Sequence, residues 1–214
     1  MIRAVIFDMD GLLTDSEVIG VTVMQECGRK QGYELDRQVI LQTIGSTNTA
    51  CRGIYRRCYP GLDGERLFED FKVAMFELAR AGGVPLKKGA KELLEALKMR
   101  GIPMAVASSS SLETIQLYLG KCGVLPYFQA LISGGADIAS KPAPDIFLKA
   151  ARTLGVPPEA CLVLEDSVNG IRAGRAAGMT VCMVPDLFPF TEELAPYCDA
   201  VKPDLAAVIP LLKA

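Results

Sequence analysis

The sequence predicts an α/β protein: a doubly wound, Rossmann-like parallel sheet with an inserted α-helical domain. Five short apolar runs recur along the chain, and strands that are apolar on both faces belong in a parallel sheet covered by helices on both sides. Stretches with helical periodicity separate most of these runs, so strand and helix alternate. One segment, from about residue 17 to residue 83, has a helical pattern and no convincing strand.

The expected strands and helices follow one another along the chain. Strands are expected at 3–7, 103–107, 130–132, 161–164 and 181–184, because each run is β-rich or continuously apolar and ends near Gly, Ser, Asp or Pro. Helices are expected at 90–100, 112–122, 144–154 and 168–177, each followed by a glycine that suits a helix C-terminus. A sixth short strand is expected near 200–202, with a last helix from about residue 205.

The helical segment directly follows the first strand, so we expect it to be an insertion into the sheet domain. The predicted division is an α/β core domain of residues 1–15 and 84–214 and a helical cap domain of residues 16–83. Breaks at glycine and proline divide the cap into about four helices. Contacts that select the substrate are expected from 45–52, although a solvated position on a helix is an equal alternative for Arg52.

Composition and charge exclude several classes of protein. Half of the residues are hydrophobic, which is enough to build a core. The net charge of −2 and the pI near 5.4 give no sign of a nucleic-acid groove or of an anionic membrane surface as partner. No apolar run approaches the roughly 18 residues that span a bilayer, and the N-terminus does not resemble a signal peptide.

The numbers of cysteines and histidines limit the kinds of metal site and catalytic site that the chain can form. Seven cysteines, an odd number without CxxC spacing, favour free thiols in a reducing cytoplasm over a disulfide framework or a zinc site. Histidine is absent, which excludes His-based triads, imidazole metal ligands and His general bases. A monomer is the simplest expectation for the oligomeric state.

Polar side chains follow four of the expected strands at their carboxyl ends, where ligands bind to an open parallel sheet. These segments are Asp8-Met9-Asp10-Gly11, Ser108-Ser109-Ser110-Ser111, Ser140-Lys141-Pro142 and Glu165-Asp166-Ser167. Each alone has an ordinary alternative: a turn or helix cap for the serines, a solvated loop for the lysine, and an N-cap for the Glu-Asp pair. A paired-aspartate motif also holds metal-bound nucleotides in glycosyltransferases. Because all four segments occur in this order and each follows a strand end, they favour a single site.

The charges at this edge indicate phosphoryl transfer assisted by a cation. Four carboxylates gather there: Asp8, Asp10, Glu165 and Asp166. They would repel one another strongly without a cation, and an all-oxygen set with open positions suits Mg²⁺.

The remaining groups suit a phosphoryl group on a small phosphorylated metabolite. Lys141 and Ser108 can hold its non-bridging oxygens, helped by backbone N–H groups of Gly11 and Ser109. Of the two carboxylates in the Asp-x-Asp pair, one attacks phosphorus and the other protonates the leaving oxygen and later takes a proton from water.

Taken together, these motifs resemble the haloacid dehalogenase (HAD) superfamily, specifically its β-phosphoglucomutase-like phosphatases. Residues 8–17 look like the first motif of the superfamily, 106–109 the second, 141–147 the third, and 165–170 with 176–179 the fourth. The resemblance implies Asp8 as nucleophile, Asp10 as acid/base, and Ser108 and Lys141 as phosphoryl ligands. It also implies Mg²⁺ held by Asp8, the Asp10 carbonyl and Asp166, with Glu165 in or next to the metal shell.

The same resemblance ranks the possible activities. Dehalogenases of the superfamily do not need the second aspartate or a metal, so Asp10 and the Glu165-Asp166 pair disfavour dehalogenation. The mutase resemblance would require a histidine shortly after the first motif, where this chain has Glu17-Val18-Ile19-Gly20. We therefore expect a phosphatase, with a β-phosphoglucomutase-type mutase as the alternative. A binding protein on the same fold would be expected to lack part of the catalytic set. The substrate stays open among sugar phosphates, a nucleotide monophosphate, phosphoglycolate and a polyol phosphate.

Overall fold

The computed structural model describes residues 1–44, 48–135 and 137–212. The chain divides into two compact units, one of Met1–Asp15 with Pro85–Ala214 and the other of Ser16–Val84. The second unit differs from the predicted cap, 16–83, only by Val84. Residues 45–47, part of the predicted specificity stretch 45–52, lie outside the described residues.

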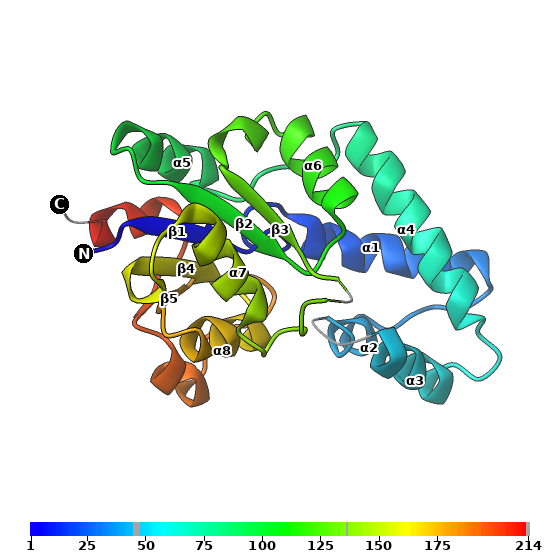
Figure 1. Ribbon diagram of the computed structural model, residues 1–214. Helices are drawn as coiled ribbons and strands as arrows, with labels where there is room; N and C mark the ends of the chain where they lie inside the picture. The colour runs from blue at the N-terminus through cyan, green and yellow to red at the C-terminus, as the bar shows by residue number, and fades with distance from the viewer. Residues whose placement is uncertain (45–47, 136, 213–214) are drawn as a thin grey trace. The chain divides into compact units, whose positions relative to one another are not determined.

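The larger unit contains a parallel sheet of six strands in the order β3-β2-β1-β4-β5-β6 (Figure 1). The strands are β1 (Ala4–Phe7), β2 (Met104–Ser108), β3 (Ala130–Ser133), β4 (Cys161–Glu165), β5 (Thr180–Met183) and β6 (Ala200–Val201). Every adjacent pair is parallel. The doubly wound parallel sheet predicted from the sequence is therefore confirmed, including its short sixth strand.

Four α-helices of this unit connect the strands. They are α5 (Ala90–Met99), α6 (Leu112–Lys121), α7 (Asp145–Leu154) and α8 (Val168–Ala176). Serine caps begin two of them: Ser111 accepts from the N–H of Thr114, and Ser167 from that of Gly170. Gly155 ends α7 in the left-handed region, at a φ of 68°.

Short 3₁₀ helices precede β3 and β4, link β5 to β6 and follow β6: η1 (Leu125–Tyr127), η2 (Pro158–Ala160), η3 (Glu192–Tyr197) and η4 (Ala206–Leu211). The last helix, expected from about residue 205, is thus a 3₁₀ helix rather than an α-helix. Pro210 lies inside it and has no N–H for an α-helical hydrogen bond, which accounts for the tighter form.

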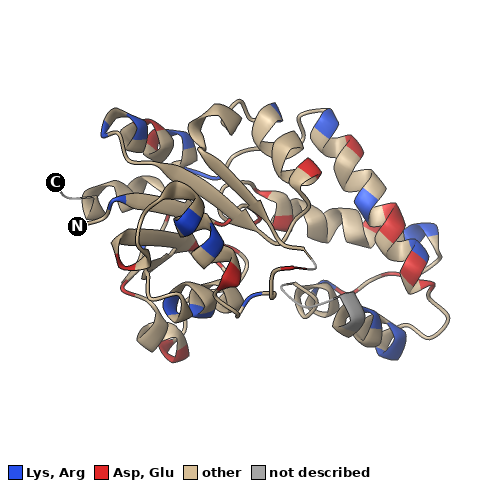
Figure 2. Ribbon diagram, viewed as in Figure 1, with Lys and Arg blue, Asp and Glu red and all other residues tan. Residues whose placement is uncertain are grey.

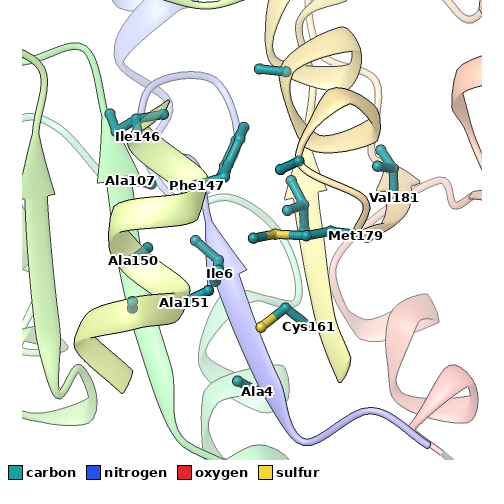
Figure 3. Packing of buried hydrophobic residues seen from close by; sticks show 14 of the residues in the cluster. Ala4, Ile6, Ala107, Ile146, Phe147, Ala150, Ala151, Cys161, Met179 and Val181 are labelled. Carbon is teal, nitrogen blue, oxygen red and sulfur yellow. The ribbon is translucent and has the colours of Figure 1, made fainter. Parts of the chain in front are cut away.

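Helices α7 and α8 cover one face of the sheet with a continuous apolar cluster (Figure 3). Alternate residues of β1, Ala4 and Ile6, belong to this cluster together with Phe147 of α7 and Ile171 of α8. Successive strand residues point to opposite faces, and Val5 and Phe7 are also fully buried. The sheet is therefore covered on both faces, as the continuously apolar strands predicted.

The smaller unit, Ser16–Val84, is helical. Its described helices are α1 (Ser16–Lys30), α2 (Arg37–Leu41), α3 (Asn48–Cys58) and α4 (Gly64–Arg80). Asp36 caps α2 and Asp63 caps α4, and the rings of Tyr55 and Phe68 pack edge to face 5.9 Å apart. Arg52 forms an ion pair of 2.8 Å with Glu65 within this unit.

The charged residues and the cysteines are distributed as the composition of the chain leads one to expect. Lys and Arg residues lie on helices of both units, and Asp and Glu residues also occur in both units (Figure 2). None of the seven cysteines, all of which the structure describes, forms a disulfide, and Cys161 and Cys182 are buried as small apolar side chains. Among the residues that the structure describes, no helix is both long and apolar enough to cross a bilayer.

Candidate active site

The candidate site lies at the carboxyl ends of β1, β2 and β4, where the strand order reverses direction. Phe7, the last residue of β1, pairs with Val106 on one side and with Leu164 on the other. Asp8 therefore leaves the sheet between Ser108 and Glu165, the last residues of β2 and β4. The ends of β1, β2 and β4, three of the four strand ends predicted to share a site, therefore lie at one edge of the sheet.

A buried ammonium group joins two of the predicted carboxylates. Lys141 Nζ donates to Asp8 Oδ1 at 2.5 Å and to Glu165 Oε1 at 2.6 Å, and it also reaches the Ala107 carbonyl at 3.3 Å. The Lys141 side chain is 7% exposed and lies 4.9 Å from the ring centroid of Phe147. Burial alone would lower the pKa of Lys141, but the Asp8 and Glu165 carboxylates raise it, so the lysine is cationic.

Glu165 is the most buried carboxylate of the site, with no exposed surface. Its Oε1 accepts from Lys141, and its Oε2 accepts three hydrogen bonds: from the N–H of Asp166 at 2.9 Å, and from the N–H and hydroxyl of Ser167 at 2.8 and 2.9 Å. Protein donors thus contact both oxygens of Glu165, which was predicted to lie in or next to the metal shell. The arrangement suits a residue that orients Lys141 better than it suits a direct metal ligand.

Two serines at the end of β2 and just after it hold Asp10. Its Oδ2 accepts from the hydroxyl of Ser110 at 2.7 Å and from that of Ser108 at 3.2 Å. The backbone carbonyl of Ser110 is itself bound by the Ser133 hydroxyl at 2.7 Å. A helix cap or turn was the expected role of Ser110 or Ser111; Ser111 is the cap of α6, whereas Ser110 contacts Asp10.

The electrostatics of this edge fit a divalent cation. Burial raises the pKa of Asp8 to about 7; Lys141 opposes this rise, while the neighbouring Glu165 and Asp10 carboxylates add to it. Asp166 is also buried, at 2% exposed, so the Asp8, Asp10 and Asp166 carboxylates together exceed what one lysine can neutralise. Because these donors are all oxygen atoms, they fit the ligand preference of Mg²⁺.

The backbone N–H groups of Gly11 and Ser109, both predicted to bind the phosphoryl group, have different surroundings in this structure. The Gly11 N–H donates to the Thr14 carbonyl at 3.0 Å, so another acceptor already uses it. Gly11 has a φ of 80°, which lets the chain turn sharply after the Asp-x-Asp pair. Ser109 is exposed and, with Lys141 and Gly134, lines a cavity of about 260 Å³ beside the site.

Asp186, Lys87 and Asp15 lie at the same edge but were missed in the sequence. Lys87 Nζ contacts Asp186 Oδ1 at 2.5 Å and Asp15 Oδ1 at 3.0 Å. An oxygen of Asp186 and one of Asp166 lie within 4.8 Å of each other. Asp186 comes three residues after β5, so the strand-end rule that located the other carboxylates also applies to it.

Comparisons with known proteins identify the family of this chain. A family model described as haloacid dehalogenase-like hydrolase matches residues 2–178. Hexitol phosphatase B of Escherichia coli is 33% identical over 187 residues, which cover 86% of this chain and 84% of that protein.

Solved structures extend the likeness to nearly the whole chain. CbbY from Rhodobacter sphaeroides, crystallised in complex with phosphate, has a TM-score of 0.82 and 28% identity and covers 97% of this chain and 96% of its own. Beta-phosphoglucomutase from Clostridium difficile has a TM-score of 0.77 and 24% identity over 100% of this chain and 94% of its own, which shows a common fold.

Proposed function

This chain belongs to the haloacid dehalogenase-like hydrolases, and on that premise we propose that it hydrolyses a small sugar-phosphate-like monoester through a phosphoryl group carried on Asp8. The family membership confirms the resemblance seen in the motifs, and the chain is a phosphoric monoester hydrolase. The proposed role of Asp8 rests on one observation: the buried Lys141 forms ion pairs with both Asp8 and Glu165 at the end of β1.

Asp8 is the proposed nucleophile. Lys141 binds Oδ1 of Asp8, which orients Oδ2 for attack on phosphorus. A bond forms between Oδ2 and phosphorus while the bond from phosphorus to the ester oxygen breaks. The Lys141 ammonium, fixed between two carboxylates, neutralises charge that develops on the transferring oxygens.

Asp10 is the proposed acid and base. It gives a proton to the departing ester oxygen and then removes one from the water that hydrolyses the aspartyl-phosphate. The Ser110 hydroxyl orients its carboxylate, and Ser133 fixes Ser110 in turn. When a phosphoryl group binds, the Ser108 hydroxyl is proposed to leave Asp10 and donate to a phosphoryl oxygen.

Mg²⁺ is the proposed cofactor, held by Asp8, the Asp10 carbonyl and Asp166. When bound, the cation supplies charge neutralisation for the phosphoryl oxygens and for the crowded carboxylates. Glu165, with its oxygens engaged by Lys141, Asp166 and Ser167, is proposed to act next to the metal shell rather than in it.

The substrate proposal comes from the relatives. Hexitol phosphatase B is named for a sugar-alcohol phosphate, and CbbY was crystallised with phosphate. We propose a phosphorylated sugar or sugar alcohol as the substrate class. A cytoplasmic, monomeric enzyme remains the expectation from the sequence.

The test is phosphate release from a panel of sugar, sugar-alcohol and nucleoside monophosphates, with Mg²⁺ and then with EDTA. The panel includes β-glucose 1-phosphate, for which glucose 6-phosphate formation is also followed. Phosphate release that EDTA abolishes is the expected result. Formation of glucose 6-phosphate without net phosphate release would instead establish the mutase alternative.

A further inference from the structure

The carboxylate of Asp186 extends the acidic edge beyond β4. The Val184 N–H donates to the Glu165 carbonyl at 2.8 Å, which keeps the chain after β5 beside the end of β4. Two residues later, Asp186 brings one of its oxygens within 4.8 Å of an oxygen of Asp166. A cation held by Asp166 would therefore lie near Asp186 as well.

The two oxygens of Asp186 have different surroundings. The side chain is 6% exposed, and Oδ1 accepts from Lys87 at 2.5 Å. Oδ2 is also buried, and no donor among the described residues forms a hydrogen bond with it. A buried carboxylate oxygen without a donor is costly, so Oδ2 is suited to a donor that arrives with a ligand.

Lys87 holds Asp186 in place from the other side. Besides Asp186, Lys87 Nζ contacts Asp15 Oδ1 at 3.0 Å, and its backbone N–H donates to the Leu13 carbonyl at 2.9 Å. Hydrogen bonding to Asp186 and Asp15 raises the pKa of Lys87 even though burial opposes this rise. One ammonium thus faces two carboxylates, so a negative charge beside Asp166 stays uncompensated.

We propose that Asp186 is a positioning carboxylate of the cation site, whose Oδ2 accepts hydrogen bonds from water bound to the cation at Asp166. The inference rests on the proposed function, because that function places Mg²⁺ at Asp166. Mg²⁺ usually keeps several of its waters in proteins, and these waters are donors of the kind that Oδ2 lacks. Carboxylates that orient such ligands typically change metal affinity by about 10- to 100-fold when they are mutated.

Calorimetric titration of Mg²⁺ into the full chain, without substrate, tests this inference apart from turnover. The variant is Asp186→Asn, which keeps the shape and an acceptor for Lys87 but places an amide in the carboxylate position. The matched control is Asp204→Asn, since Asp204 pairs with Lys88 in the same unit at 2.8 Å. The Kd for Mg²⁺ is expected to rise at least about tenfold in Asp186→Asn and to stay unchanged in the control.

Each outcome separates the two proposals. If the wild-type chain binds no Mg²⁺, the metal part of the proposed function fails and this inference with it. If the wild-type chain binds Mg²⁺ and Asp186→Asn binds it equally well, or both variants weaken it alike, only the role of Asp186 is overturned.

Thermal unfolding in EDTA checks that the variants fold. Should Asp186→Asn not fold, Asp186→Glu replaces it, because this variant keeps the charge and moves the carboxylate outward by one methylene. Weaker Mg²⁺ binding by Asp186→Glu supports a positioned acceptor, and unchanged binding contradicts it.

Discussion

Gly170 makes room for the carboxylate of Glu165. A Cβ built on Gly170 would lie 1.7 Å from Glu165 Oε1, the oxygen that accepts from Lys141. The Gly170 N–H also donates to the Ser167 hydroxyl oxygen at 3.1 Å, so this turn of α8 is fixed against the end of β4. The absence of a side chain at residue 170 thus allows Glu165 to hold Lys141, and Lys141 in turn contacts Asp8.

Gly170→Ala is expected to lower kcat at least about tenfold, because the new methyl group displaces the carboxylate that orients Lys141. Gly120→Ala is the matched control: Gly120 lies in α6, and a Cβ there meets nothing within 4 Å. Steady-state kinetics of both variants check this prediction. Wild-type kcat in Gly170→Ala would show that the Glu165 side chain can move without cost.

Lys141→Met is expected to abolish turnover and to lower the free energy of unfolding by about 3–5 kcal/mol, because it leaves two buried carboxylates without their cation. Lys88→Met removes an ion pair whose lysine is 86% exposed, so water screens this pair and the loss of stability should be far smaller than in Lys141→Met. Urea unfolding without metal measures both changes. Equal stability losses in the two variants would argue against a special role for the buried pair.

Ser110→Ala is expected to impair catalysis, whereas Ser111→Ala is expected to lower stability. Ser110→Ala removes a hydrogen bond to the Asp10 carboxylate and should lower kcat about tenfold with little change in KM. Ser111→Ala removes the α6 cap and should cost about 1 kcal/mol of stability while kcat is retained. Kinetics and thermal unfolding of the pair separate the two roles, and a kcat loss shared by both would contradict the assignment.

Much of the site is predictable because it follows a local rule. Asp8, Ser108 and Glu165 stand at the ends of apolar strands, and parallel strands bring their carboxyl ends to one edge. Asp186 follows β5 and its position carries the same signal, although it was not among the predicted site residues. The Lys87–Asp186 pair joins residues 99 positions apart, and local sequence contains nothing that specifies such a contact.

Other features depend on contacts that only the folded chain defines. The role of Ser110 depends on Asp10, 100 residues away, so the serine run alone could not separate a carboxylate partner from a cap. The engagement of both Glu165 oxygens depends on Lys141 and on the shape of the turn at Ser167. The last helix differs for a local reason, since Pro210 in the sequence already disfavours an α-helix.

The most direct test of Asp8 as nucleophile is to trap the phosphorylated side chain during turnover. The enzyme is mixed with the best monoester of the panel, quenched in acid and reduced with borohydride, which converts an aspartyl-phosphate to homoserine. Peptide mass spectrometry is expected to find homoserine at residue 8, and none in Asp8→Asn, which should fold normally but not turn over. Full turnover by Asp8→Asn, or homoserine at a different aspartate, would contradict the proposed mechanism.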